Sequence, residues 1–154
     1  MTQTNLAYLS NYSIYSSMVL FTIAFFSHAL EVSFSLRNES DKTKFDFART
    51  DKSGRVGSAM MILGFVFLLA GVVFRGWSAH RVPWGNMYEF SITGAMAFSG
   101  AYLYALKKYK LRWLGLPVSI AVLLTLGTAI TLLYRPSAPL VPALKSTWLA
   151  IHVS

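Results

Sequence analysis

The sequence contains no cysteine. This absence excludes an intrachain disulfide, a thiolate metal site and any thiol chemistry of the chain itself. Any redox chemistry must therefore come from a bound group. The first thirteen residues also lack lysine and arginine, and no cleavage site of small residues follows them. Because a secretory signal needs both features, we expect the first apolar run to remain as a transmembrane helix.

Charged residues are also scarce: they make up 13% of the chain, against 55% hydrophobic residues that fall in long blocks. The blocks are uninterrupted rather than alternating, which favours membrane helices over a barrel. The expected fold is all-α, a single polytopic membrane domain of residues 1–154. Its predicted helices cover residues 14–36, 56–74, 87–106 and 114–134, with the start of a fifth helix at 146–154.

The positive charges predict the topology. The loops at 37–55 and 107–113 carry ten of the fourteen Lys and Arg residues, and the loops at 75–86 and 135–145 carry the other four. The positive-inside rule places the first two loops in the cytoplasm and the amino terminus outside. The formal net charge of +8 then reflects topology and contact with anionic lipid. We expect no nucleic-acid partner, because these short loops offer no basic groove.

Small residues predict two smooth helix faces for close packing against other helices. The first face repeats every seven residues, and the second lies on the next helix. The residues of the first face are Gly57, Gly64 and Gly71, and those of the second are Gly94, Ala97 and Ala101.

The polar and aromatic stretch 81–90 separates two apolar runs. Asn86 is a candidate N-cap, and Glu89 stands three residues later, where its carboxylate can bond back to the cap and favour the helix dipole. Trp84 and Tyr88 suit the aromatic belt at a membrane surface. A helix start at the membrane surface therefore accounts for these residues without a ligand.

The wider cluster admits a second interpretation. Trp77, His80, Arg81 and Trp84 fall in one short outer segment. Aromatic faces beside a cation and an imidazole suit a flat, apolar, acid-bearing ligand such as haem, whose propionates an arginine can pair with.

The three histidines have different expectations. His28 stands one turn before Glu31, near the cytoplasmic end of its helix, and packing or an interface hydrogen bond explains it. His80 is expected in solvent. His152 follows Trp148 by four residues, hence on the same helix face, and is a candidate axial ligand of haem iron. A hydrogen bond between helices is the alternative for His152.

Two segments together resemble a known family. The sequence RVPWGNMYEFS at 81–91, followed by LVPALKSTWLAIHVS at 140–154, is similar to the amino-terminal half of CcsA/ResC-type cytochrome c biogenesis proteins. This family is the membrane partner in the system II cytochrome c synthetase and belongs to the haem-handling proteins. The segment 12–31 resembles the opening helix of bacterial members more weakly.

The resemblance implies a function in the bacterial plasma membrane. Members present haem b on the extracytoplasmic face for covalent attachment to apocytochrome c, together with a ResB/Ccs-type membrane subunit, as a holocytochrome c synthase or haem lyase complex. It implies that His152 is an axial ligand of the haem iron. The remaining residues expected around the haem are Trp148, Trp84, Arg81, Asn86 and Glu89.

The chain also departs from the family pattern. In the family, the fifth helix is followed by a tryptophan-rich outer segment, a second external histidine and a membrane-embedded histidine. The sequence has none of these features. Lys145 also stands where the family more often has a neutral amide. We therefore expect a fragment, a truncated product or an inactive remnant that does not synthesise holocytochrome alone. Two other functions stay open: a b-type haem anchor or electron-transfer subunit that uses His28, and a scaffold or transporter without a cofactor.

Overall fold

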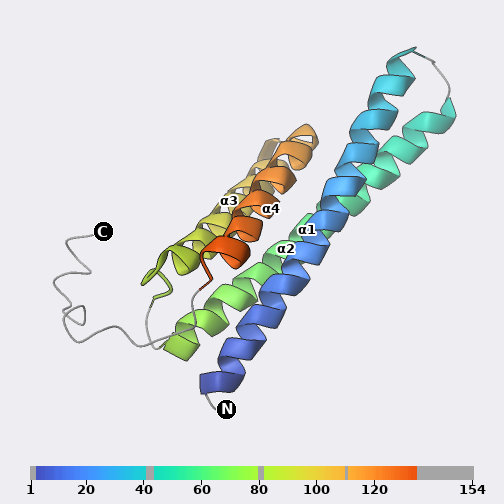
Figure 1. Cartoon of the computed structure of the whole chain (residues 1–154). Coiled ribbons are helices and arrows are strands. Elements are labelled where there is room, and N and C mark those ends of the chain that lie inside the picture. Colours follow the sequence, from blue (N-terminus) through green and yellow to red (C-terminus); the bar gives the residue numbers. More distant parts are fainter. Residues whose placement is uncertain (1–2, 41–43, 80–81, 110, 135–154) are drawn as a thin grey trace.

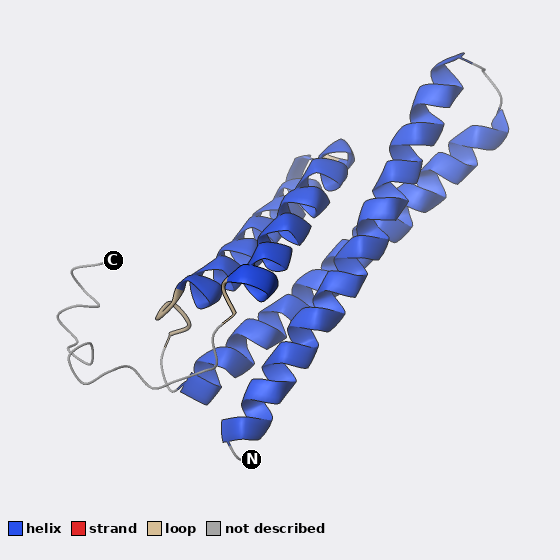
Figure 2. Cartoon of the chain, viewed as in Figure 1, coloured by secondary structure: helices blue, strands red, loops and turns tan. Residues whose placement is uncertain are grey.

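The structure is a computed structural model that describes residues 3–40, 44–79, 82–109 and 111–134. All regular structure in this part of the chain is helical, which confirms the all-α prediction (Figure 2). The elements are α1 (Gln3–Ser40), α2 (Lys44–Ala79), α3 (Met87–Tyr109), the 3-10 turn η1 (Arg112–Leu114) and α4 (Gly115–Leu132).

The helices form two antiparallel pairs that lie side by side (Figure 1). Helix α1 packs along α2, α3 packs against α4, and the pairs meet through α1 with α4 and α2 with α3. Helix α1 has 38 residues, which corresponds to about 57 Å at 1.5 Å per residue. The α1–α2 pair therefore projects beyond the shorter α3–α4 pair on the side where α1 ends (Figure 1).

Three segments of the described helices are long and apolar enough to cross a membrane: Asn5–Leu36, Asp51–Ala79 and Arg112–Leu132. Helix α3 is also long, with 23 residues, but its serines, tyrosines and Glu89 lower its mean hydropathy. The expected count of four spanning helices is therefore supported for three. The predicted fifth helix at 146–154 and the predicted outer loop at 135–145 lie outside the described residues.

The predicted loop at 37–55 needs a correction. Helix α1 continues to Ser40, and α2 begins at Lys44, so most of this charged stretch is helical. Charge excludes a residue from the bilayer core but not from a helix, and Lys, Arg, Glu and Ala are good helix formers in water. Helix α2 likewise continues to Ala79, into the predicted outer loop at 75–86.

The predicted glycine face of α2 is confirmed, and its partner is α1. A Cβ atom on each of these three glycines would come within 2.7 to 3.1 Å of an α1 side chain. The contacts pair residues that recur every seven positions on both helices: Gly57 with His28, Gly64 with Phe21 and Gly71 with Ile14. Ser10 also donates a 2.7 Å hydrogen bond from its hydroxyl to the Gly71 carbonyl. The absence of a side chain at these three positions of α2 thus permits the close approach of α1.

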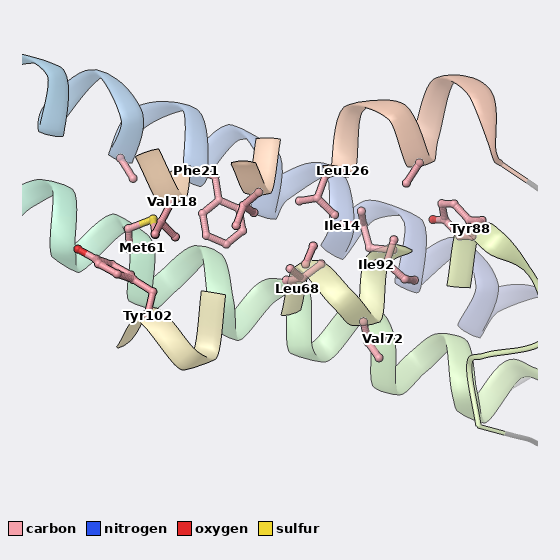
Figure 3. Close-up of a cluster of buried hydrophobic side chains, with 14 residues drawn as sticks. Ile14, Phe21, Met61, Leu68, Val72, Tyr88, Ile92, Tyr102, Val118 and Leu126 are labelled. Atoms are coloured by element: carbon pink, nitrogen blue, oxygen red, sulfur yellow. The ribbon is translucent and has the colours of Figure 1, made fainter. Parts of the chain in front are cut away.

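The core lies where the four helices meet. Figure 3 shows Phe21 and Ile14 of α1 facing Leu68 of α2 and Leu126 of α4. These side chains are fully buried. At one end of the core lies Tyr88, beside the candidate site (Figure 3).

Candidate functional site at the start of helix α3

The beginning of α3 has the cap that the sequence predicts. The Glu89 backbone N–H donates to Asn86 Oδ1 at 2.8 Å, and the Phe90 N–H donates to the Asn86 carbonyl at 3.0 Å. A side-chain oxygen thereby satisfies one of the backbone donors that a helix leaves unpaired at its start. Asn86 is thus an N-cap residue.

The side chain of Glu89 is fully buried. Its Oε2 accepts a 3.0 Å hydrogen bond from the backbone N–H of Gly85, one residue before the cap residue that a capping box would use. Its Oε1 accepts a 3.3 Å hydrogen bond from Nε of Arg75 on α2. The carboxylate therefore ties the α2–α3 connection to both helices.

Arg75 is the functional-site candidate that the sequence pattern did not single out. It is 1% exposed, and its guanidinium lies 5.1 Å from the centre of the Tyr88 ring. It is also the only charged residue between 56 and 79, a signal that could have identified it, because an ionisable group near a membrane span is costly unless it is paired. The sequence prediction had placed it in the outer loop at 75–86.

Aromatic and polar contacts connect Arg75, Tyr88 and Glu89 to α1 and to the residues after α4. The rings of Tyr88 and Tyr134 meet edge to face with centres 5.4 Å apart. Asn11 of α1 donates from Nδ2 to Tyr134 Oη at 3.0 Å. The same end of the bundle therefore carries linked side chains from α1, α2, α3 and the residues after α4.

The structure places half of the residues predicted to surround a haem. Trp84 is 59% exposed, and its backbone N–H donates to the Val82 carbonyl at 2.8 Å. Asn86 and Glu89 are engaged in the cap and the ion pair, so they support the connection rather than present free groups. The other predicted site residues, Arg81, Trp148 and His152, lie outside the described residues.

A second polar cluster occupies the opposite end of the bundle. Glu31 accepts a hydrogen bond from Nδ1 of His28 at 3.1 Å and two from Arg112, at 3.0 Å from Nε and 2.6 Å from Nη2. Arg112 also donates from Nη1 to Asp51 at 2.8 Å. From the sequence, packing or an interface hydrogen bond was expected for His28. The structure shows a hydrogen bond to Glu31, which is connected through Arg112 of η1 to Asp51 of α2.

His28 does not fit an axial haem ligand. Its ring is 1% exposed, and a Cβ on Gly57 or Gly115 would lie 2.9 or 2.5 Å from it. Glycines of α2 and α4 therefore pack against the imidazole, and a haem macrocycle has no space beside it. Within the described residues, no group of three or more His, Asp or Glu side chains could hold a metal ion.

These features define a multi-pass helical membrane protein whose α2–α3 end is organised by a buried Arg–Glu pair. Similarity searches identify its relatives as proteins named cytochrome c biogenesis protein CcsA. The chain is 32% identical over 102 residues to the Marchantia polymorpha protein, which covers 64% of this chain and 32% of the relative. It is 34% identical over 104 residues to the Picosynechococcus protein, covering 66% of this chain and 30% of the relative.

A Prochlorococcus marinus relative of the same name aligns over 142 residues, 90% of this chain and 41% of the relative, at 29% identity. No family model matches the chain, and no solved structure does. The resemblance to the CcsA-type family is confirmed. The matched segments cover 30 to 41% of the length of these relatives, so the chain corresponds to only part of them.

Proposed function

We propose that this protein acts in cytochrome c biogenesis by holding haem at the outer membrane surface for attachment to apocytochrome c. The observation that carries the proposal is the similarity to CcsA proteins over as much as 90% of the chain. Haem b is the substrate in this proposal, and apocytochrome c and a ResB/Ccs-type membrane subunit are the partners. The chain spans only part of the length of its relatives, so the activity of the whole protein is part of the proposal.

The proposed haem site lies at the α2–α3 end, on the extracytoplasmic side of a bacterial plasma membrane. His152 would supply an axial nitrogen to the haem iron. Trp148, four residues before it, and the exposed Trp84 would cover the faces of the macrocycle, and Arg81 would pair with a propionate.

The buried pair of Arg75 and Glu89 gives this site a firm wall. Glu89 holds the Gly85 N–H and the Arg75 guanidinium at the same time. The backbone on the carboxyl side of Trp84 is therefore fixed to two helices. A rigid connection keeps an exposed aromatic ring in place for a flat ligand at a smaller entropic cost than a mobile loop would.

The packing around His28 weighs against a b-type haem anchor. Such a protein holds haem between histidines inside the membrane, and His28 is packed against Gly57 and Gly115. In our proposal, bound haem supplies the electrophilic vinyl groups that react with the cysteine thiols of the apocytochrome. The residues of this chain bind and orient the haem.

Deletion of the coding region in a host that expresses this protein tests the proposed role. Covalent haem staining of c-type cytochromes should fall strongly, while the b-type haem spectrum of the membranes stays unchanged. Unaltered c-type cytochromes would contradict the proposal, and loss of a b-type spectrum alone would favour the anchor.

A further inference from the structure

The end of α3 opposite the candidate haem site carries an exposed group of cations and aromatic rings. Its members are Tyr104, Lys107, Lys108, Tyr109 and Trp113, all exposed. We call them the inner aromatic–lysine cluster. Lys107 and Lys108 lie in the last turn of α3, where the unpaired carbonyls of the helix end attract cations.

Lys108 is held by two rings. Its Nζ lies 5.8 Å from the centre of the Tyr104 ring and 5.2 Å from the centre of the Tyr109 ring. Both separations are within the range of a cation–π interaction. The ammonium group is therefore oriented by neighbours on its own helix, without a carboxylate.

The contrast with Arg112 is informative. Arg112 lies between Tyr109 and Trp113 in the sequence, and its charge is neutralised by Glu31 and Asp51. None of the ion pairs found within the described residues involves a lysine. The two lysines thus carry positive charge that the described part of the chain leaves uncompensated, and Trp113, five residues after Lys108 in the sequence, is exposed.

We propose that the inner aromatic–lysine cluster binds the headgroup of an anionic phospholipid. Tyrosine and tryptophan rings favour the boundary between acyl chains and headgroups. Lysines at that level attract anionic lipid, each by about a fivefold preference. The lipid phosphate fits the lysine ammonium groups, and the rings fit the glycerol and upper acyl region. This inference goes beyond the proposed function and does not depend on it.

Lipid selectivity can be measured on the full chain in phosphatidylcholine vesicles by tryptophan quenching. Trp77, Trp84 and Trp148 are replaced by Phe, so that Trp113 is the sole reporter, and brominated phosphatidylglycerol is compared with brominated phosphatidylcholine. We expect phosphatidylglycerol to be preferred. Lys108→Gln should reduce the preference about fivefold, and the double variant Lys107→Gln/Lys108→Gln should reduce it more than tenfold.

Lys52→Gln is the matched control, because Lys52 is an exposed lysine of α2 outside the cluster. Its preference should change less than twofold. An equal loss in this control would show a general charge effect and overturn the proposal, as would unchanged selectivity in the Lys108 variant. Displacement of the lipid by millimolar inorganic phosphate would instead assign a site for soluble anions. Circular dichroism of each variant verifies that the helices are intact.

Discussion

Arg75 on α2 and Glu89 on α3 form a buried ion pair, with 3.3 Å between Nε and Oε1. The pair joins residues 14 positions apart across the α2–α3 connection. Glu89 uses its second oxygen to hold the Gly85 N–H. One side chain thereby determines how the connection approaches helix α3.

Removal of one member of this pair should destabilise the protein strongly. Glu89→Ala leaves the buried Arg75 guanidinium without this carboxylate, and we expect a loss of about 3–5 kcal/mol in the free energy of unfolding. Titration with sodium dodecyl sulfate in mixed micelles, followed by circular dichroism, measures this quantity.

The double variant Arg75→Leu/Glu89→Leu shows whether the loss of stability comes from breaking the ion pair or from any change at these two positions. It should be clearly more stable than Glu89→Ala, because it removes both charges of the buried pair rather than one. Arg55→Leu, which removes an exposed arginine of the same helix, should have little effect. Equal losses for the single and double variants would contradict a central role for the pair.

The carboxylate of Glu31 should matter more than that of Asp51, although both bind Arg112. Glu31 is 13% exposed and also accepts a hydrogen bond from His28, whereas Asp51 is 58% exposed. Glu31→Gln should cost about 1–3 kcal/mol, because the hydrogen bonds to a charged group are lost in a largely buried position. Asp51→Asn should cost less, because water screens exposed pairs. The reverse order in the same unfolding assay would contradict this ranking.

Two glycines that differ only in their surroundings test the packing of His28. A Cβ on Gly115 would lie 2.5 Å from His28 Nε2, whereas a Cβ on Gly94 would have no neighbour within 4 Å. Gly115→Ala should therefore destabilise by about 1–3 kcal/mol through overpacking. Gly94→Ala should stabilise by up to about 1 kcal/mol, because alanine favours the helix. Similar effects of both changes would show that the ring is not confined between α2 and α4.

The proposed topology can be tested without background labelling, because the chain has no cysteine. Asn5→Cys and Lys52→Cys place single thiols on exposed positions near opposite ends of the α1–α2 pair. A membrane-impermeant maleimide should label the first variant in intact cells and the second only after permeabilisation. Labelling of the Lys52 variant in intact cells would contradict the predicted orientation.

The sequence was sufficient for the helical fold, the family and the cap. Apolar blocks indicate membrane helices, and Asn86 is the N-cap that its local pattern predicts. The Glu89 carboxylate, in contrast, binds the Gly85 N–H and Arg75 of another helix.

The glycine spacing predicted a close-packed face. It did not predict that this face packs against α1, where His28, Phe21 and Ile14 recur with the same seven-residue spacing. Seven-residue spacing on one helix does not reveal which other helix it meets.

Other features could not be predicted because they depend on pairing across helices. The charged stretch at 37–55 was expected as a loop, since charge alone does not distinguish loop from exposed helix. Arg75 was assigned to the outer loop at 75–86, and its pairing depends on the approach of Glu89 on another helix. Likewise, the role of Glu31 depends on Arg112, 81 positions away.

The haem spectrum of the purified full chain tests the proposed function most directly. Membranes are supplied with haem, and the protein is compared with its His152→Ala and His28→Ala variants. We expect a Soret band that is lost in His152→Ala and retained in His28→Ala, because His28 is packed against glycines whereas His152 is the proposed axial ligand. A chain that retains no haem, or one that loses it only in His28→Ala, would contradict the proposal.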